Sequence, residues 1–496
     1  MNKSYQPWTQ DQAYLLPPSL RDWLPEDHLA WFILDVVSQL DLSAIERAIQ
    51  SKDARGQRPY HPSMMVALLV YAYCTGVYSS RRIERACHED VAFRVMTGNA
   101  QPYFTTINEF RRMHREHFGA LFVEVLKLCR EAGLVKLRHV AIDGTKVKAN
   151  ASKHKAMSYK RMLKEERRLR AEVERLLGEA DAADASEDAR YGAEARGDEL
   201  PEELRRRESR LERIREAKAA LEAEARKTRA HTLREQAERN EHTAQTHPEE
   251  IVRRRAHTNA AKRRVQAEEL DPGDDDPPGG GSADGELARK PTLATPEGKP
   301  VDKAQRNFTD PDSSIMKGAD GFIQAYNAQL AVDDAHQVIV ACGVTDQPAD
   351  AANLEPMLER VRANVGVAPE HATGDTGYWN PQVETRARAL GTEAWVATER
   401  VRHGEAGPAT RTGDPPDELD PLERMRWRLD TAEGRALYAR RKAVVEPVNG
   451  QIKHARRFRQ FSLRGIDAVD AEWTMVSLCH NVLKLFGHRC AGPSPA

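Results

Sequence analysis

The chain has 496 residues, a length that accommodates roughly two to four domains and a sizeable core. Hydrophobic residues make up 40% and charged residues 30% of the sequence, and the formal net charge is −1, so the overall balance gives no sign of a polyanionic partner and local charge clusters matter instead. The six cysteines are scattered without a C-x-x-C pair, which excludes that type of zinc or redox motif and is typical of reduced thiols.

The most apolar stretch is MMVALLVYAYCTGVY at residues 64–78, and its length of about fifteen residues is too short to span a bilayer. The sequence does not begin with the charged, apolar and small-residue regions of a secretory signal peptide. We therefore expect a soluble protein of the cytoplasm that has no membrane partner.

Residues 17–133 have a helical pattern throughout. A Pro-Ser pair, a serine pair and a threonine pair are typical helix starts, and they open three segments near residues 62, 80 and 104. The sequence therefore predicts an all-helical N-terminal domain, residues 1–135. Three arginines of the last segment are placed as on a DNA recognition helix, with a solvated basic helix face as the alternative: Arg111, Arg112 and Arg115.

Residues 136–151 have the composition of a strand, and the pattern then changes sharply. From about 155 to 265 the chain is dominated by Ala, Glu, Arg, Leu and Lys, with apolar residues at heptad-like spacing, such as Leu204, Leu211 and Ile214. We expect a helical insertion at residues 152–267, formed as an antiparallel coiled-coil hairpin or as a solvated helical spacer. Residues 268–305 are rich in Pro, Gly and Asp and are predicted to form a flexible linker.

Residues 306–487 return to alternating strands and helices. The stretch 322–345 predicts two antiparallel strands, a helix follows at about 353–361, and PEHATGD and EAWVAT predict two more strands before the closing helices. Residues 136–151 supply the first strand, so we expect a mixed α/β core, residues 136–151 and 306–487. The insertion interrupts this core between its first and second strands, and residues 488–496 form a tail.

Three acids lie at or near the ends of these elements. Asp143 lies in the first strand segment, HVAIDGTKVKANAS, Asp375 ends the fourth strand, and Glu446 lies in the helical stretch that follows. If the first and fourth strands are neighbours, the two aspartates lie side by side and a helix on that edge can supply the glutamate. Converging carboxylates repel one another unless divalent cations neutralise them, and two such ions about 3.5 to 4 Å apart can promote in-line displacement at a phosphodiester. The predicted catalytic and metal-binding residues are therefore Asp143, Asp375 and Glu446, which would hold two Mg²⁺ ions, with Mn²⁺ as the alternative cation.

These segments resemble those of the DDE transposases of bacterial insertion sequences, whose catalytic core is ribonuclease H-like. AIDGTKVKANAS is similar to the family's first-aspartate segment, TGDTGYWN to its second and VVEPVNGQIK to its glutamate segment. The N-terminal region also resembles the helical domain that precedes the core in many members, so the likeness covers nearly the whole chain apart from the insertion. It implies a ribonuclease H-like mixed sheet with flanking helices and an enzyme that cleaves DNA and transfers strands.

The family's signature around the glutamate is Y-x-x-R-x-x-x-E-x-x-x-x-x-x-K. Tyr438, Arg441, Glu446 and Lys453 match it, with one extra residue between the arginine and the glutamate. Pro447, which follows the glutamate directly, is expected to break or kink a helix at this point. The match therefore depends mainly on Glu446 and Lys453.

Basic residues surround Glu446 in the sequence. A site that binds phosphate explains both the many positive charges and the single acid of this stretch, and the alternative is a solvated basic helix. The candidate DNA-binding residues outside the N-terminal domain are Lys146, Tyr438, Arg441, Lys453, Arg456 and Arg457. Four further acids are expected to have structural roles in turns and at helix starts: Asp310, Asp312, Asp346 and Asp350.

The predicted function is that of a transposase that acts on double-stranded DNA, both at the ends of its element and at the target. Pairing two DNA ends calls for a homodimer or a larger assembly in the DNA complex, and the protein would then be associated with the nucleoid. Two alternatives remain open: a ribonuclease H-like nuclease without strand transfer, and a DNA-binding protein whose carboxylates no longer bind metal.

Overall fold

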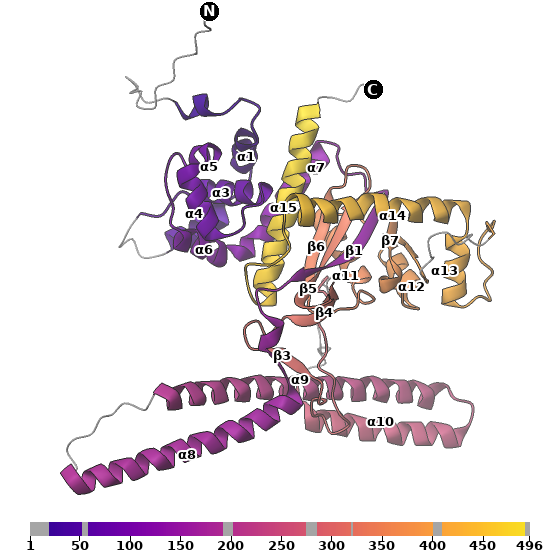
Figure 1. The fold of residues 1–496 in the computed structure, drawn as a ribbon. Coiled ribbons are helices and arrows are strands. Elements are labelled where there is room, and N and C mark those ends of the chain that lie inside the picture. The colour runs from indigo at the N-terminus through magenta and orange to yellow at the C-terminus, as the bar shows by residue number, and fades with distance from the viewer. Residues whose placement is uncertain are drawn as a thin grey trace, which may run out of the picture.

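The computed structural model of the protein describes residues 19–51, 58–191, 202–273, 285–318, 321–399 and 409–491. The fold comprises an N-terminal helical region, a mixed sheet with covering helices, and a set of long projecting helices that interrupt the sheet after its first strand (Figure 1). None of the helices within the described residues is both long and apolar enough to cross a membrane. Of the predicted tail, residues 488–491 complete the last helix and residues 492–496 lie outside the described part.

The N-terminal region is helical, as the sequence predicts. Its elements are η1 (Leu20–Trp23), α1 (Leu29–Ser38), α2 (Ser43–Gln50), α3 (Pro62–Cys74), α4 (Ser80–Glu89), α5 (Val91–Met96), α6 (Phe104–Met113), η2 (Arg115–His117) and α7 (Phe118–Glu131). Two predicted segments are interrupted. Asp90 separates α4 from α5 because its Oδ1 accepts a hydrogen bond from the Ala92 N–H at 2.8 Å and so caps the second helix. The turn η2 separates α6 from α7.

Six strands form one mixed sheet: β1 (His139–Lys148), β4 (Ser314–Gly318), β5 (Gly321–Asp333), β6 (Ile339–Thr345), β7 (His371–Gly374) and β8 (Glu393–Val396). β1 pairs with β5 in antiparallel fashion and with β7 in parallel fashion, and β8 is parallel to β7. β6 and β4 both pair antiparallel with β5, along different parts of it. The prediction that the first strand of the core and the strand ending at Asp375 are neighbours is confirmed.

The helices of the core alternate with its strands in the predicted order. They are α11 (Leu354–Val365), α12 (Val383–Ala389), α13 (Pro421–Leu429), α14 (Ala432–Gly450) and α15 (Ile466–Ala491), with a π-helical turn η5 (Gln451–Ala455) after α14. α14 crosses the sheet and contacts β1, β5, β7 and β8, whereas α15 contacts β6 and the N-terminal helices α3 and α7 (Figure 1). α15 therefore joins the sheet to the N-terminal region.

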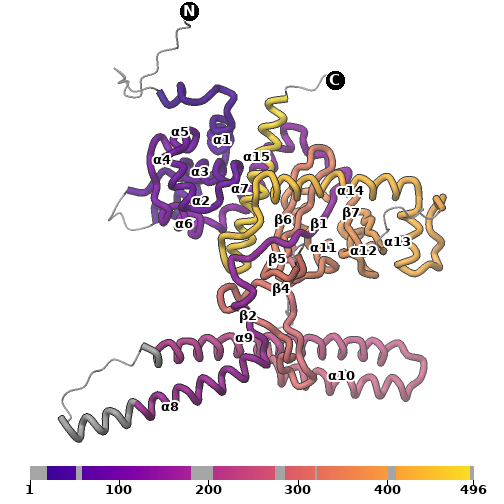
Figure 2. Tube along the Cα trace, in the orientation of Figure 1, coloured from indigo at the N-terminus to yellow at the C-terminus, as the bar shows by residue number. Residues whose placement is uncertain are grey.

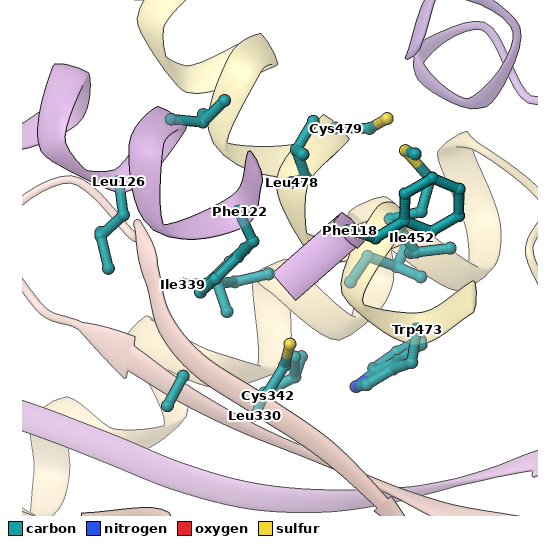
Figure 3. Packing of buried hydrophobic residues seen from close by; sticks show 14 of the residues in the cluster. Phe118, Phe122, Leu126, Leu330, Ile339, Cys342, Ile452, Trp473, Leu478 and Cys479 are labelled. Carbon is teal, nitrogen blue, oxygen red and sulfur yellow. The ribbon is translucent and has the colours of Figure 1, made fainter. Parts of the chain in front are cut away.

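The N-terminal helices and the sheet share one hydrophobic core. Phe118 and Phe122 of α7 lie among side chains of β5, β6 and α15, as the close view in Figure 3 shows. Trp473 of α15 is fully buried, and its Nε1–H donates to the backbone oxygen of Gln329 in β5 at 3.0 Å. The chain boundary near residue 135 is therefore not a boundary in the packing.

Within the described residues, the insertion contains three helices: α8 (Tyr159–Tyr191), α9 (Glu202–Thr246) and α10 (Glu250–Leu270). α9 packs against α8 along its first part and against α10 along its last part, so the helices project to two sides below the core (Figures 1 and 2). The sequence suggested a single hairpin, whereas here two helix pairs share one long helix. The chain enters through β2 (Ala156–Ser158) and leaves through its antiparallel partner β3 (Gln305–Asn307).

Part of the predicted flexible linker is ordered. Leu287 is only 2% exposed and belongs to the core. The Gly285 N–H donates to Glu359 Oε2 at 3.0 Å, and the Thr292 hydroxyl donates to Glu224 Oε2 at 2.6 Å. These contacts with α11 and α9 fix residues 285–305 and contradict a flexible linker there, while residues 274–284 lie outside the described residues.

His480 of α15 makes the stability of this core dependent on pH. Its Nε2–H donates to the backbone oxygen of Gln337 at 2.8 Å, and burial, with help from the nearby charges of Arg456 and Lys484, lowers its pKa to about 3. In the unfolded chain the pKa is about 6.5, so acid protonates the unfolded state first. This contribution to stability is complete above pH 6.5 and is lost as the pH falls from there towards 3, by about 2 kcal/mol at pH 5.

We therefore expect His480→Gln, which keeps an N–H donor, to remove this acid-induced loss of folding stability. The variant should have a lower Tm than the wild-type protein at pH 7.5, and the difference should shrink by a few degrees at pH 5.0. Thermal unfolding of both proteins at the two pH values measures it. A Tm difference that stays the same at both values would contradict the assignment.

Candidate active site

Asp143 lies in β1, the central strand of the sheet. The three residues before it, Val140, Ala141 and Ile142, are fully buried, so the strand is fixed where the aspartate emerges. Asp143 Oδ2 accepts a hydrogen bond from Asn449 Nδ2 at 3.0 Å, and Arg441 Nη1 lies 3.6 Å from Oδ1. Burial raises the pKa of the Asp143 carboxyl to about 6, Arg441 lowers it, and three acids raise it further: Asp375, Asp350 and Glu446.

Asp375 follows β7 directly, beside β1. It is the N-cap of the short turn η4 (Thr376–Tyr378), and its Oδ1 accepts a hydrogen bond from the Gly377 N–H at 2.8 Å. A side-chain carbon at Gly377 would lie 3.0 Å from Asp375 Oδ1 and 3.3 Å from Asp350 Oδ2. The carboxylates of Asp375 and Asp350 are therefore neighbours at the edge of the sheet.

Asp350 is an acid for which the sequence predicted a structural role only. Its Oδ1 accepts hydrogen bonds from Asn327 Nδ2 at 2.6 Å and Gln329 Nε2 at 2.8 Å, and its Oδ2 lies 3.6 Å from Lys146 Nζ. These bonds bear out a structural role, but the side chain also adds a fourth carboxylate to the site. Sequence reasoning missed Asn327 and Gln329, although two polar residues at alternate positions in a mostly apolar part of strand β5 were a usable signal.

Gly144 allows this polar network to approach β1. In the pairing of β1 with β5, Gly144 lies opposite Gln329 and Lys146 lies opposite Asn327. A side-chain carbon at Gly144 would lie 2.4 Å from both Asp350 Oδ1 and Gln329 Nε2. A larger residue next to Asp143 would therefore have to displace the side chains of Asp350 and Gln329.

Glu446 is an exposed residue of α14, on the helix that crosses β1 and β7. Its negative charge contributes to the raised pKa of Asp143, so the two acids face the same region. Asn449, which sequence reasoning missed, lies three residues further along the same helix and so shares a face with Glu446. That spacing was visible in the sequence.

Pro447 was expected to break or kink the helix, and the expected break does not occur. The helix runs through it to Gly450 and continues as the π-helical turn η5. Proline has no N–H to donate to the carbonyl four residues earlier, which belongs to Ala443. Gln337 Nε2 donates to this Ala443 oxygen at 3.0 Å and so replaces the missing helical hydrogen bond.

Lys453 lies in η5 and connects this turn to β1. Its ammonium donates to the Thr145 hydroxyl and, at 2.9 Å, to the backbone oxygen of Lys146. Burial lowers the pKa of Lys453 to about 8, although the charge of Asp143 opposes this effect. The charge at this edge is thus acidic on β1 and after β7 and basic on η5.

Two predicted DNA-binding residues are buried, and these predictions are wrong. Arg111 is 4% exposed and donates to the Tyr73 hydroxyl at 2.9 Å and the Tyr78 backbone oxygen at 3.1 Å. Arg456 is 6% exposed and donates to the Val476 backbone oxygen at 3.1 Å. Both guanidinium groups donate to acceptors inside the protein and cannot reach DNA.

The other predicted DNA-binding residues divide into two groups. Arg441 is also largely buried, and it faces Asp143 and lies 5.9 Å from the centre of the Tyr438 ring. Lys146 faces Asp350. The exposed members are Arg112, Arg115 and Arg457.

The donor types at this site fit a divalent cation. Carboxylate oxygens are the ligands that Mg²⁺ prefers. Burial raises the pKa of Asp143 most, and the repulsion from neighbouring acids, which raises it further, is the kind that such a cation relieves. Among the described residues, however, no three His, Cys, Asp or Glu side chains are arranged as a set of metal ligands. The oxygens of Asp143 face Arg441 and Asn449 instead, so ligation requires these side chains to reorient.

Two stretches of the chain match known protein families. Residues 18–113, which include α1 to α6, match the family described as Transposase domain (DUF772). Residues 416–486, which include Glu446 and Lys453, match the family described as Transposase DDE domain. No significantly similar curated protein and no significantly similar solved structure was found.

Proposed function

We propose that this chain, which its two family matches identify as a DDE transposase of an insertion sequence, binds the ends of its own element, cleaves the DNA beside them and joins the freed 3′-hydroxyls to target DNA. The observation that carries the proposal is the pairing of β1 with β7, which sets Asp143 beside Asp375, with Glu446 on the helix that crosses both strands. DNA is accordingly the partner, and a homodimer or larger assembly would pair the two ends.

We further propose that the core is ribonuclease H-like. The strand order β6-β5-β1-β7-β8 supports this proposal, because three antiparallel strands are followed by two strands parallel to β1. In this arrangement the acids of β1 and β7 lie on adjacent parallel strands. The insertion leaves the sheet between β1 and β4 and does not interrupt this order.

In the proposed mechanism, Asp143, Asp375 and Glu446 would hold two Mg²⁺ ions, or Mn²⁺, and these ions would supply Lewis-acid activation of water or a 3′-hydroxyl and stabilisation of the leaving oxygen. Arg441 and Asn449 hold the carboxylate of Asp143 in place and reduce the cost of its charge. Asn327 and Gln329 orient Asp350 in the same way. Lys146 and Lys453 place positive charge beside the acids, where the phosphate of the scissile strand would lie.

The experiment that tests the function uses duplex DNA taken from the genomic sequence that flanks the gene. The protein is incubated with this DNA and Mg²⁺, and the cleaved ends are mapped. Cleavage at fixed positions together with a joined product supports the proposal. Cleavage without joining would favour a nuclease, and binding without cleavage would favour an inactive DNA-binding protein.

Lys453→Ala should weaken the binding of end DNA and reduce the dependence of the affinity on salt by about one counterion, because one phosphate contact is lost. Gel-shift titrations at several salt concentrations measure both quantities. Lys127→Ala, which removes an exposed charge from α7, is the matched control and should change neither. An unchanged salt dependence in Lys453→Ala would restrict this lysine to its contacts with Thr145 and Lys146.

A further inference from the structure

A basic groove lies at the root of the insertion, where α8 and α9 meet the two-stranded β2–β3 sheet. Its volume is about 1170 Å³, and its apolar floor includes Met157, Ile214 and Phe308. Among the described residues that line it, none is acidic. The basic residues that define the groove are Lys155, Arg161, Arg205, Arg206, Arg210 and Arg213.

The basic residues of this groove have fewer ion-pair partners than the arginines elsewhere in the insertion. Beyond the groove, arginines such as Arg168, Arg170 and Arg264 form ion pairs with glutamates. Within it, Arg210 lies 4.0 Å from Glu165, which already pairs with Arg168 at 2.9 Å. No ion pair joins Lys155 or Arg213 to another residue in the described part of the chain. Lys155 and Arg213 therefore present positive charge in the groove that no ion pair neutralises within the described residues.

The size and exposure of the groove favour a macromolecular ligand. Its volume exceeds the roughly 300–1,000 Å³ of pockets that enclose small molecules. Lys155, Arg161, Arg210 and Arg213 are exposed, so their charged ends can follow a surface that passes over the groove. Exposed Lys and Arg side chains with no acid among them are the groups that contact nucleic-acid phosphates.

The groove is also close to the candidate active site along the chain. Twelve residues separate Asp143 in β1 from Lys155, so their Cα atoms lie at most roughly 40 Å apart. At about 3.4 Å for each base pair, this distance corresponds to roughly twelve base pairs of duplex. A DNA duplex with a phosphodiester at the acids of β1 and β7 is therefore long enough to reach the groove.

We propose that this basic groove binds the sugar-phosphate backbone of duplex DNA, within about twelve base pairs of the phosphodiester that is cleaved. The inference rests on the proposed function for the position of the duplex. The contacts are with phosphates and carry no sequence information, so the groove adds affinity and fixes the orientation of the DNA on the protein. The insertion thereby serves as a second DNA-binding surface beside the core.

The test compares two double variants of the full chain that lose the same charge. Arg210→Gln with Arg213→Gln neutralises part of the groove, and Arg254→Gln with Arg255→Gln removes two exposed arginines of α10, outside the groove. The probes are a duplex that carries the flanking genomic sequence, an unrelated duplex and a single-stranded RNA. Binding is measured at several salt concentrations, hydroxyl-radical footprints are recorded on the flanking duplex, and cleavage is assayed at saturating protein.

The groove variant should bind both duplexes about tenfold more weakly, with a salt dependence reduced by about two counterions, and its footprint should shorten on one side of the cleavage site. The α10 variant should behave like the wild-type protein. Cleavage at saturating protein should persist in the groove variant. If the wild-type protein did not cleave the DNA, the proposed function would be overturned, and the binding measurements would still test whether the groove contacts DNA. Equal duplex binding by the wild-type protein and the groove variant, weakening confined to RNA, or no duplex binding by the wild-type protein would each overturn the inference.

Discussion

Glu446→Gln should reduce Mg²⁺-dependent cleavage of end DNA by roughly 1,000-fold or more and change the affinity for that DNA by less than about threefold. Glutamine keeps the size of the side chain and its exposed position on α14, but it removes the negative charge that a divalent cation requires. The loss therefore falls on chemistry and not on charge neutralisation of DNA. Cleavage assays and gel-shift titrations on the same protein preparations measure the two effects.

Glu433→Gln is the matched control, because Glu433 is an exposed acid in the first turn of the same helix. It should leave cleavage and binding unchanged. Asp143→Asn and Asp375→Asn should behave like Glu446→Gln. If Glu446→Gln weakened binding as much as cleavage, the residue would serve a structural contact and its role in catalysis would have to be withdrawn.

Arg111→Met should destabilise the folded protein by about 3–5 kcal/mol, because it removes a buried charge whose partners remain behind. The guanidinium connects α6 to the Tyr73 hydroxyl, the Tyr78 backbone oxygen and the Ser462 hydroxyl, so it joins the N-terminal helices to the segment before α15. Glu472, which accepts a hydrogen bond from the Tyr73 hydroxyl at 3.2 Å, would also lose a neighbouring positive charge. Urea denaturation of the variant and the wild-type protein measures the change.

Arg112→Met provides the control at the adjacent, exposed position. It should alter stability by less than about 0.5 kcal/mol, and any effect it has should appear in DNA binding. Similar stabilities of Arg111→Met and the wild-type protein would show that the buried network contributes little. In that case the assignment of Arg111 to the core rather than to DNA would lose its support.

The order of strands and helices in the core was predictable because each element has its own local pattern. The apolar run before Asp143 and the turn residues after Asp375 indicate two strands, and the pattern between them predicts two further strands and a helix. The strand β7 does end beside Asp375, but β1 continues past Asp143 to Lys148, so the prediction that Asp143 lies near a strand end is wrong. The sheet also contains β4, which the pattern did not predict. What local pattern did not give was the path of the insertion. Heptad-like spacing identifies helices, but it does not determine whether α9 packs against one partner or two.

The buried arginines show a different limit, because charge alone was used to assign them to DNA. Arg111 follows Ile107 and Phe110 at positions four and one residues earlier, so it lies on the apolar face of α6. That spacing was present in the sequence and predicts burial. Arg456 gave no such signal, since its carbonyl and guanidinium are held by Tyr78 and Val476, which are distant in the chain.

The course of α14 through Pro447 could not be predicted from the sequence. A proline inside a helix leaves a carbonyl without its partner, and sequence alone predicts an interruption. Gln337, 106 residues before Ala443, supplies the missing donor and allows Glu446 and Asn449 to remain on one continuous helix. A long-range contact of this kind is set by the packing of the sheet against α14 and has no local signature.

The central claim is that Asp143, Asp375 and Glu446 hold divalent cations, and localised oxidative cleavage of the protein tests it most directly. Fe²⁺ takes the place of Mg²⁺ in oxygen-ligand sites, and with ascorbate and peroxide it generates radicals that cut the nearest backbone. The account predicts cuts beside residues 143, 375 and 446, which excess Mg²⁺ suppresses and Asp143→Asn removes. Cuts confined to other parts of the chain, or cuts at these three positions that persist in Asp143→Asn, would contradict it.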